Sequence, residues 1–230
     1  MELTLRPRRV WLTLCGVALT LGALSASTWY LRERLGIRLL GLGRLLGVGL
    51  EQSLPTWYSV LLLAAAALTT AAVAAGEAKT RDGLAWKALA AGFALLSLDE
   101  QVGMHESAGK ALRILNELDG FFYFGWVIPG GAVALLCLFA FSGLLRRLPA
   151  RRRNQLLLAD ALYVGGAVGM EMVGAKAFSL TDDRTAPLYT LCYHLEELFE
   201  MLGVSLYLAA LVEHLAERRD DAVLTLRAKL

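Results

Sequence analysis

The sequence predicts an all-α fold: a polytopic bundle of about six transmembrane helices with both chain ends in the cytoplasm. Three observations predict this class. The chain has 230 residues, of which 57% are hydrophobic, and its mean hydropathy of +0.52 is higher than a soluble domain can accommodate. The charged residues, 19% of the total, cluster between long apolar segments. The basic residues are also distributed unequally between alternate loops.

Six apolar segments follow one another along the chain, each near the ~20 residues that a helix needs to cross the hydrocarbon core. They cover residues 10–31, 54–75, 84–105, 121–145, 155–178 and 187–212. Because little sequence remains for a soluble domain, residues 1–230 are predicted to form a single transmembrane domain. The glycine-rich segment 32–51 is expected to be either an amphipathic helix on the outer surface or a loop.

The first apolar segment has two interpretations. Its arginine-rich start, apolar centre and small residues at 23–27 also fit a signal peptide. The apolar character continues to residue 31, which gives the segment spanning length and favours an uncleaved anchor. Cleavage would leave five spans and would change nothing downstream.

The basic residues predict the orientation. A cytoplasmic N-terminus places 15 of the 23 basic residues on the cytoplasmic side, including five arginines within residues 146–153. Aromatic residues near the proposed span ends agree with this orientation, since tryptophan and tyrosine concentrate at membrane interfaces. We therefore expect a multi-pass protein of the cell's inner (plasma) membrane with both termini in the cytoplasm.

Several classes of protein and site are not indicated. The net charge of +2 is small, and the arginines lie near the ends of apolar segments, so the chain is not expected to bind nucleic acid. A disulfide framework or a CxxC site is not expected either, because no paired spacing relates the three cysteines, Cys15, Cys137 and Cys192. The expected partners are membrane lipids. A homo-oligomer through the fifth span is a further expectation, since small residues allow close helix contact at Gly165, Gly166, Gly169 and Gly174.

Ionisable residues interrupt three of the apolar segments, and a charge inside a membrane span is by default a functional-site hypothesis. Glu100, Glu171 and Glu197 each lie ~22–24 Å from the inner end of their predicted helix, at ~1.5 Å per residue. We therefore expect the three side chains to meet at one level. In a hydrocarbon core ~30 Å thick that level is in the outer half, so the site is expected to open toward the outside.

The balance of charge at this level indicates a metal. The only basic or imidazole groups near the acidic side chains are Lys176 and two histidines, so either several carboxylates are protonated or a cation lies among them. Di-iron and di-manganese helix bundles combine inward glutamates with Glu-x-x-His pairs. His194, Glu197 and Glu200 are spaced three residues apart, so they share one helix face. Here the histidine precedes the glutamates, which is the reverse of the order in Glu-x-x-His. We therefore predict a di-iron or di-manganese centre, with the ligands Glu100, His105, Glu171, His194, Glu197 and Glu200.

Other roles and other metals remain open at this stage. Asp99 and Glu196 are the candidates for a catalytic role or for orienting the ligands. Glu100 and His105 are five residues apart and diverge on a regular helix unless it distorts near Gly103, so Asp99 or Glu106 is an alternative partner for His105. One zinc ion with an open position for water is also compatible with these ligands. Carboxylate-rich surroundings favour iron or manganese.

Two paired segments resemble parts of uncharacterised bacterial multi-pass membrane proteins. They are Ser97-Leu98-Asp99-Glu100 with the later His105-Glu106, and Leu195-Glu196-Glu197 with Glu200-Met201-Leu202-Gly203. The resemblance covers the third to the sixth segment and implies no activity. The ligand pattern is also similar in kind to that of membrane di-iron enzymes, although their histidine-rich boxes are absent.

Three functions follow as hypotheses. The first is a metal-dependent membrane oxidoreductase or hydrolase that acts on a lipid or hydrophobic substrate from the outer leaflet. The second is a proton or divalent-cation transporter or channel that uses the same carboxylates. Transport requires a path to the cytoplasm, and the inner halves of the spans offer few polar residues beyond Thr69, Thr70, Tyr163 and Asp160. The third is a noncatalytic membrane subunit or sensor.

Overall fold

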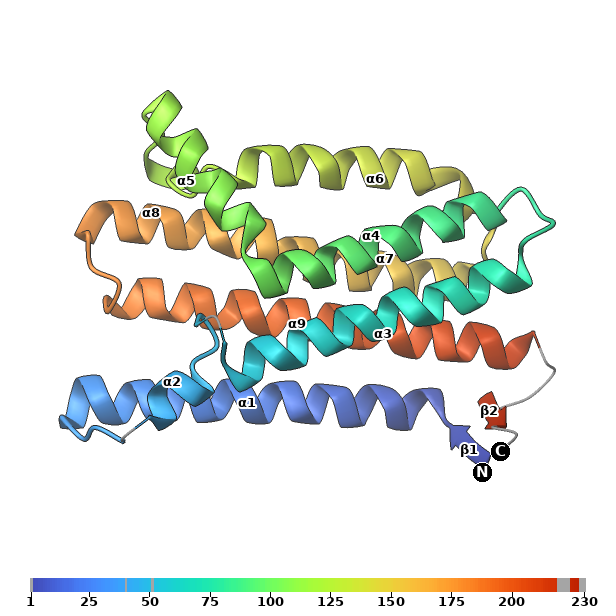
Figure 1. Ribbon diagram of the computed structural model, residues 1–230, viewed down its shortest axis with the longest axis horizontal. Coiled ribbons are helices and arrows are strands. Elements are labelled where there is room, and N and C mark those ends of the chain that lie inside the picture. Colours follow the sequence, from blue (N-terminus) through green and yellow to red (C-terminus); the bar gives the residue numbers. More distant parts are fainter. Residues whose placement is uncertain (1, 40, 51, 219–223, 228–230) are drawn as a thin grey trace.

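The fold is a bundle of long helices that run along the long axis of the molecule (Figure 1). The computed structural model describes residues 2–39, 41–50, 52–218 and 224–227. Five helical segments in this part of the chain are long and apolar enough to cross a membrane. They are α1 (Pro7–Leu35), α3 (Leu54–Gly76), α6 (Val127–Arg147), the segment Ala150–Thr181, and α9 (Pro187–Glu217).

A sixth long helix, α4 (Gly83–Val102), packs along α3 (Figure 1). Its 20 residues are sufficient for a span, at ~1.5 Å per residue. It differs from the five apolar helices because Lys87 lies near its start and Asp99 and Glu100 lie in its last turn. The acidic pair that interrupts its apolar character belongs to the candidate site.

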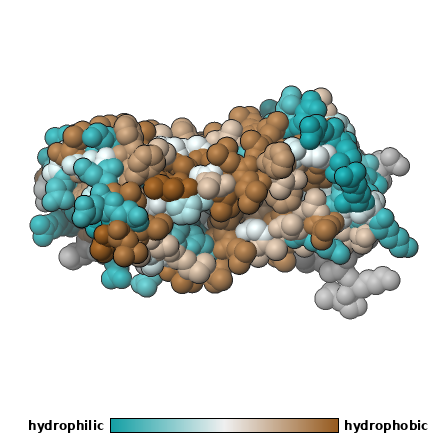
Figure 2. Space-filling model, turned by 90° about the horizontal axis from the view of Figure 1, so that it is seen from above, coloured by the Kyte–Doolittle hydropathy of each residue, from teal (hydrophilic) through white to brown (hydrophobic). Residues whose placement is uncertain are grey.

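The two ends of the bundle differ in composition. Both chain termini lie at one end, which we call the terminal end, where β1 (Glu2–Leu5) pairs antiparallel with β2 (Leu224–Arg227) (Figure 1). This short ribbon was not predicted. The opposite, distal end consists of α5 (Met104–Asn116), the chain between α1 and α3, and the loop between α8 (Glu171–Thr181) and α9. Apolar side chains form a broad band between two hydrophilic ends (Figure 2), as expected for a protein that spans a membrane.

The core is centred on α9, which packs against α1, α3, α7 (Ala150–Val164) and α8. Its side chains Met201, Val204 and Leu211 are almost fully buried. A polar contact lies within this apolar core, because Tyr207 Oη and Thr70 Oγ1 are 2.8 Å apart. The central position of α9 brings its acidic residues against several neighbouring helices at once.

The third span ends before residue 105, where the prediction placed its distal end. A continuous helix over 84–105 is wrong, because α4 ends at Val102 and α5 begins at Met104. Gly103 between them has φ +67 and ψ +38, a left-handed conformation that side chains with a Cβ adopt at a cost. The change of direction at Gly103 separates His105 from Glu100 and allows α5 to leave the bundle axis (Figure 1).

One other predicted boundary near the distal end needs correction, and the open alternative for residues 32–51 can be described. The fourth span begins at Val127 instead of residue 121, because a short 3-10 helix, η1 (Gly120–Phe122), and a turn come first. In the segment 32–51, of which residues 40 and 51 are outside the described residues, residues 32–35 complete α1, and the rest is loop or turn around one short helix. This helix is the five-residue α2 (Leu42–Leu46), and the chain then returns to α1, where Val48 N donates to Ser25 Oγ at 3.1 Å.

The fifth span is continuous from Ala150 to Thr181, but it contains a π-helical stretch, η2 (Gly165–Met170), between α7 and α8. Wide turns of this kind occur mostly at functional sites. Gly166 and Gly174 lie against α9, whereas a Cβ on Gly165 or Gly169 would meet no described atom within 4 Å. Gly166 and Gly174 therefore allow close contact with α9, whereas Gly165 and Gly169 lie on a face without a close neighbour among the described residues.

Candidate functional site: an acidic cavity in the distal half

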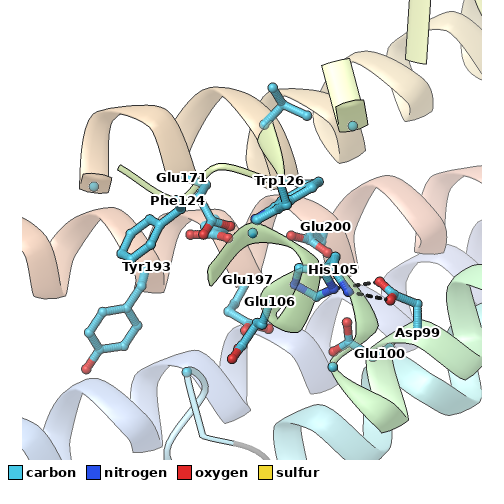
Figure 3. Close-up of a pocket in the computed structure, with 18 of the residues that line it drawn as sticks. Asp99, Glu100, His105, Glu106, Phe124, Trp126, Glu171, Tyr193, Glu197 and Glu200 are labelled. Carbon is cyan, nitrogen blue, oxygen red and sulfur yellow. Dashed lines mark hydrogen bonds and ion pairs between the residues drawn. The ribbon is translucent and has the colours of Figure 1, made fainter. Parts of the chain in front are cut away.

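A cavity of about 550 Å³ lies among α4, α5, α6, α7, η2, α8 and α9. Seven of the eight predicted site residues line it, although they come from separate parts of the sequence. Figure 3 shows side chains from different helices arranged around this common space. The predicted residues in the lining are Asp99, Glu100, His105, Glu171, Glu196, Glu197 and Glu200. The structure thus brings together the acidic positions that the depth argument placed at one level.

The five predicted glutamates enter the cavity from three helices, and Glu106 of α5 and Asp160 of α7 also line it. Glu100 extends from the last turn of α4, and Glu171 is the first residue of α8, directly after the π-helical stretch. α9 contributes the other three predicted carboxylates, those of Glu196, Glu197 and Glu200. All five side chains are partly buried, since they face the cavity instead of bulk water or close-packed core. Unpaired carboxylates in such a place are costly, so their charge requires protons or a bound cation as compensation.

Asp99 and His105 form the best-defined polar contact in the cavity (Figure 3). His105 Nδ1 lies 2.6 Å from Asp99 Oδ2, and the backbone N–H of His105 donates to Asp99 Oδ1 at 2.9 Å. Asp99 therefore caps the start of α5 and orients the imidazole ring. A carboxylate on Nδ1 leaves Nε2 as the free ring nitrogen, the arrangement that orients histidine ligands in metal sites. The alternative in which Asp99 is the partner of His105 is the one that the structure shows.

Replacing Asp99 with alanine is expected to lower the free energy of unfolding by about 1–2 kcal/mol, because α5 loses its N-terminal cap. The same variant should increase hydrogen exchange of the backbone amides in the first turn of α5. Both quantities can be measured in detergent micelles by chemical unfolding and by mass spectrometry of the exchanged protein. Asp119→Ala is the matched control, since Asp119 is an exposed acid at the same end of the bundle. Equal behaviour of the two variants would contradict a capping role for Asp99.

His194 is the predicted ligand that the structure places elsewhere. Its Nδ1 lies 2.8 Å from the carbonyl oxygen of Thr190, and its Nε2 lies 3.1 Å from Ser25 Oγ on α1. Both ring nitrogens therefore have partners outside the cavity lining. The spacing of His194, Glu197 and Glu200 is compatible with one face of α9. In the structure, however, His194 contacts α1, whereas Glu197 and Glu200 line the cavity. The arrangement in the structure does not include the reversed Glu-x-x-His motif.

The predicted ligands share a cavity without converging on one point. Within the described residues, no group of three or more histidine, cysteine, aspartate or glutamate side chains is close enough to hold a metal ion. Glutamate side chains have several rotatable bonds, so the carboxylates can approach one another by rotamer changes without movement of the helices. A metal centre in this cavity would require such rearrangement of its ligands.

An aromatic wall borders the polar groups. The Trp126 ring lies edge-on to His105, with centroids 4.8 Å apart, and both residues line the cavity. The indole N–H of Trp126 is buried and has no hydrogen-bond partner in the part of the chain that the structure describes. A buried donor of this kind is available to a ligand or to a carboxylate oxygen in the cavity. Gly109 permits this packing, because a Cβ there would lie 3.0 Å from Trp126 N.

Two parts of the lining were not predicted from the sequence. Residues 48–50, which follow α2, fold back against α9, and the Gly49 Cα lies so close to Tyr193 that a Cβ would approach its ring at 3.1 Å. Lys110, Arg113 and Arg184 also line the cavity at the distal end. The amphipathic pattern of residues 104–116 could have predicted that the basic residues of α5 lie on one helix face. The fold of residues 48–50 could not be predicted in this way, because it depends on a long-range contact with Ser25.

Apolar side chains of two helices also line the cavity. Leu96 of α4 and Val133 and Ala134 of α6 belong to its lining, so the cavity occupies the space between these helices. α6 lies at the edge of the bundle and packs mainly on α7 and η2, whereas α4 packs mainly on α3 (Figure 1). The cavity therefore combines polar groups with apolar side chains of α4 and α6, as ligand-binding cavities commonly do.

The cavity ends well short of the terminal end. On α7 the lining begins at Asp160, ten residues after the helix start at Ala150, which corresponds to ~15 Å along the helix. A separate polar network occupies the terminal end. It consists of the ion pairs Arg152–Glu213, Arg152–Glu217, Arg151–Glu213, Arg147–Asp82 and Arg218–Glu77.

Comparison with known proteins identifies a family. The model of a domain of unknown function, DUF8692, matches residues 9–214, which is most of the chain, and the chain belongs to this family. The match agrees with the resemblance of the acidic segments to uncharacterised multi-pass membrane proteins. No curated protein and no solved structure matches the sequence. The family assigns no activity, so the function is inferred from the cavity.

Proposed function

We propose that this member of the DUF8692 family is a six-span protein of the bacterial inner membrane that binds a divalent metal, iron or manganese, and acts on a lipid or hydrophobic substrate. The observation that supports the proposal most is that carboxylates from α4, α8 and α9 and the Asp99–His105 pair line one cavity. None of the five glutamates forms an ion pair with a described basic residue, so a bound cation would stabilise them, and hard oxygen ligands with one imidazole favour iron or manganese over zinc.

The proposed ligands are the cavity residues among those predicted. Glu100, Glu171, Glu197 and Glu200 would provide oxygen, and His105 would provide Nε2, with Asp99 on its other ring nitrogen. Glu196 lines the same space and is the remaining candidate for a catalytic acid or base. A metal bound in this set supplies Lewis-acid or redox chemistry, which supports either an oxidoreductase or a hydrolase.

The proposed orientation places the distal end outside and both termini in the cytoplasm. The basic residues support it, because the terminal end contains the arginines of the α6–α7 connection. With α4 counted as the sixth span, the cavity would lie in the outer half of the membrane. A lipid or another hydrophobic substrate would reach the carboxylates along the apolar lining residues of α4 and α6. Gly165 and Gly169, which face away from α9, are available for contact with a second copy in the proposed homo-oligomer.

The proposal predicts that the metal depends on glutamates from different helices. Glu171→Gln and Glu197→Gln should each lower the affinity for Mn²⁺ by about 100-fold, since each removes an anionic ligand while conserving size. The measurement is a Mn²⁺ titration of metal-depleted protein in detergent, followed by electron paramagnetic resonance of the free ion. Glu33→Gln, at the distal end outside the cavity lining, is the control and should bind like the wild type. Unchanged Mn²⁺ affinity in both cavity variants would refute the assignment.

Transport of protons or divalent cations is the second candidate. One observation favours it: the cavity includes Tyr163 and Asp160, which extend its polar lining from the carboxylates toward the terminal end. The remaining ~15 Å of α7 leads to the ion-pair network, so transport would require that network to open. Metal-dependent flux in proteoliposomes that is lost in Asp160→Asn would favour transport over the enzyme.

A further inference from the structure

Two arginines at the distal end of the cavity have no anionic partner in the described part of the chain. Arg113 on α5 and Arg184 in the α8–α9 loop both line the cavity, and neither forms an ion pair there. The third basic residue of the lining, Lys110, differs, because its Nζ lies 3.2 Å from Glu106 Oε2. The two guanidinium groups therefore have unused capacity for an anion.

Aromatic contacts hold both arginines in position. The Arg113 guanidinium lies over the Tyr123 ring, 4.3 Å from its centroid, and the Arg184 guanidinium lies over Phe178 at 5.4 Å. The two rings contact each other, with centroids 5.0 Å apart. Both cations thus lie on neighbouring members of one aromatic cluster, and this arrangement limits their motion without using their hydrogen-bond donors.

The three parts of the cavity match the three parts of an amphiphile. The basic groups lie at the distal end, the carboxylates and His105 are central, and apolar residues of α4 and α6 line the space that faces the hydrocarbon. A planar guanidinium recognises phosphate oxygens through paired hydrogen bonds, and two of them can share one phosphate group. An acyl chain would lie against Leu96, Val133 and Ala134, where a soluble anion would have no complementary surface.

We propose that the cavity binds a lipid with an anionic phosphate head, with the phosphate on Arg113 and Arg184 and an acyl chain between α4 and α6. This inference rests on the proposed function, because it specifies the hydrophobic substrate as a phosphate-bearing lipid. The head would be fixed at the outer interface, and the first part of the chain would pass beside the carboxylates and His105. The reacting bond would then lie close to the lipid backbone.

The test compares three probes at constant nonionic detergent: dihexanoyl phosphatidic acid, dihexanoyl phosphatidylcholine and inorganic phosphate. Calorimetric titration should show tightest binding of phosphatidic acid to the wild type. The double variant Arg113→Gln/Arg184→Gln should bind phosphatidic acid at least about 10-fold more weakly, since two charge-assisted contacts are lost. Arg38→Gln, at the same end but outside the lining, is the control and should match the wild type. Arg113→Lys/Arg184→Lys conserves the charge and should give an intermediate affinity.

Three outcomes would overturn the inference. Equal affinity of the wild type and the folded double glutamine variant would show that the arginines do not bind the head. Equal affinity for phosphatidylcholine would show that the net charge of the head is not recognised. Inorganic phosphate binding as tightly as phosphatidic acid would identify a site for a free anion. Mn²⁺ affinity, measured on the same variants, separates this inference from the proposed function, because loss of two positive charges from the cavity should not weaken Mn²⁺ binding, whereas Glu171→Gln should weaken it.

Discussion

Replacing Gly166 with valine is expected to destabilise the protein by about 3 kcal/mol and to impair the cavity at the same time. A Cβ on Gly166 would lie 2.7 Å from the carbonyl oxygen of Glu196 and 3.2 Å from Glu200 Cγ. The clash is with backbone, so side-chain rotation cannot relieve it, and η2 must move away from α9. Glu171 begins the helix that follows η2 and would move with it.

The neighbouring glycine provides a matched control for this experiment. A side chain on Gly165 would meet no described atom within 4 Å, although it belongs to the same π-helical stretch. In monomeric protein, Gly165→Val should therefore change the free energy of unfolding by less than about 1 kcal/mol. Both variants can be compared by chemical unfolding in mixed micelles and by Mn²⁺ titration. Equal losses in the two variants would mean that helix propensity, and not contact with α9, determines the effect.

Replacing Glu213 with alanine is expected to cost about 3–5 kcal/mol, the usual effect of removing one partner from a buried ion pair. Glu213 accepts from Arg151 at 2.8 Å, from Arg152 at 3.0 Å and from Gln155 at 3.0 Å. The Arg152 side chain is only 2% exposed, so the loss leaves a buried cation with fewer partners. The measurement is chemical unfolding in detergent at two salt concentrations. A buried pair should depend little on the concentration of salt.

The control for this prediction is Glu217→Ala. Glu217 also contacts Arg152, at 3.0 Å, but its side chain is 55% exposed. Exposed ion pairs contribute about 1 kcal/mol or less, so this variant should remain close to the wild type. If both variants lose the same stability, the terminal network is not a buried structural element. Breaking the ion pairs of the network would then cost less free energy, so a transport path could open there more easily.

The long helices were predictable because their signal is averaged over many residues. Apolar runs and arginine clusters determine α1, α3, α6 and α9 to within a few residues, apart from the start of α6. The shared level of Glu100, Glu171 and Glu197 followed from counting residues, because a helix has a constant rise and the membrane aligns the helices. That argument placed the three glutamates together without any knowledge of the packing.

Features that depend on one residue or on a distant contact were not predictable in the same way. The turn at Gly103 redirects the chain within a single residue, and a glycine alone does not reveal whether its left-handed conformation is used. His194 is compatible with the cavity face by spacing, but a hydrogen bond to Ser25, 169 residues earlier, directs it toward α1. Arg113 and Arg184 line the same cavity as the carboxylates only because α5 and the α8–α9 loop meet at the distal end.

The metal content of the purified wild-type protein tests the central claim most directly. The protein should be prepared in detergent and analysed for iron, manganese and zinc per chain, beside Glu171→Ala and Glu197→Ala. We expect about two equivalents of iron or manganese in the wild type and a large loss in both variants. One equivalent of zinc would instead indicate a hydrolase. Folded wild-type protein that contains no metal and takes up none of the three would contradict the proposed metal site.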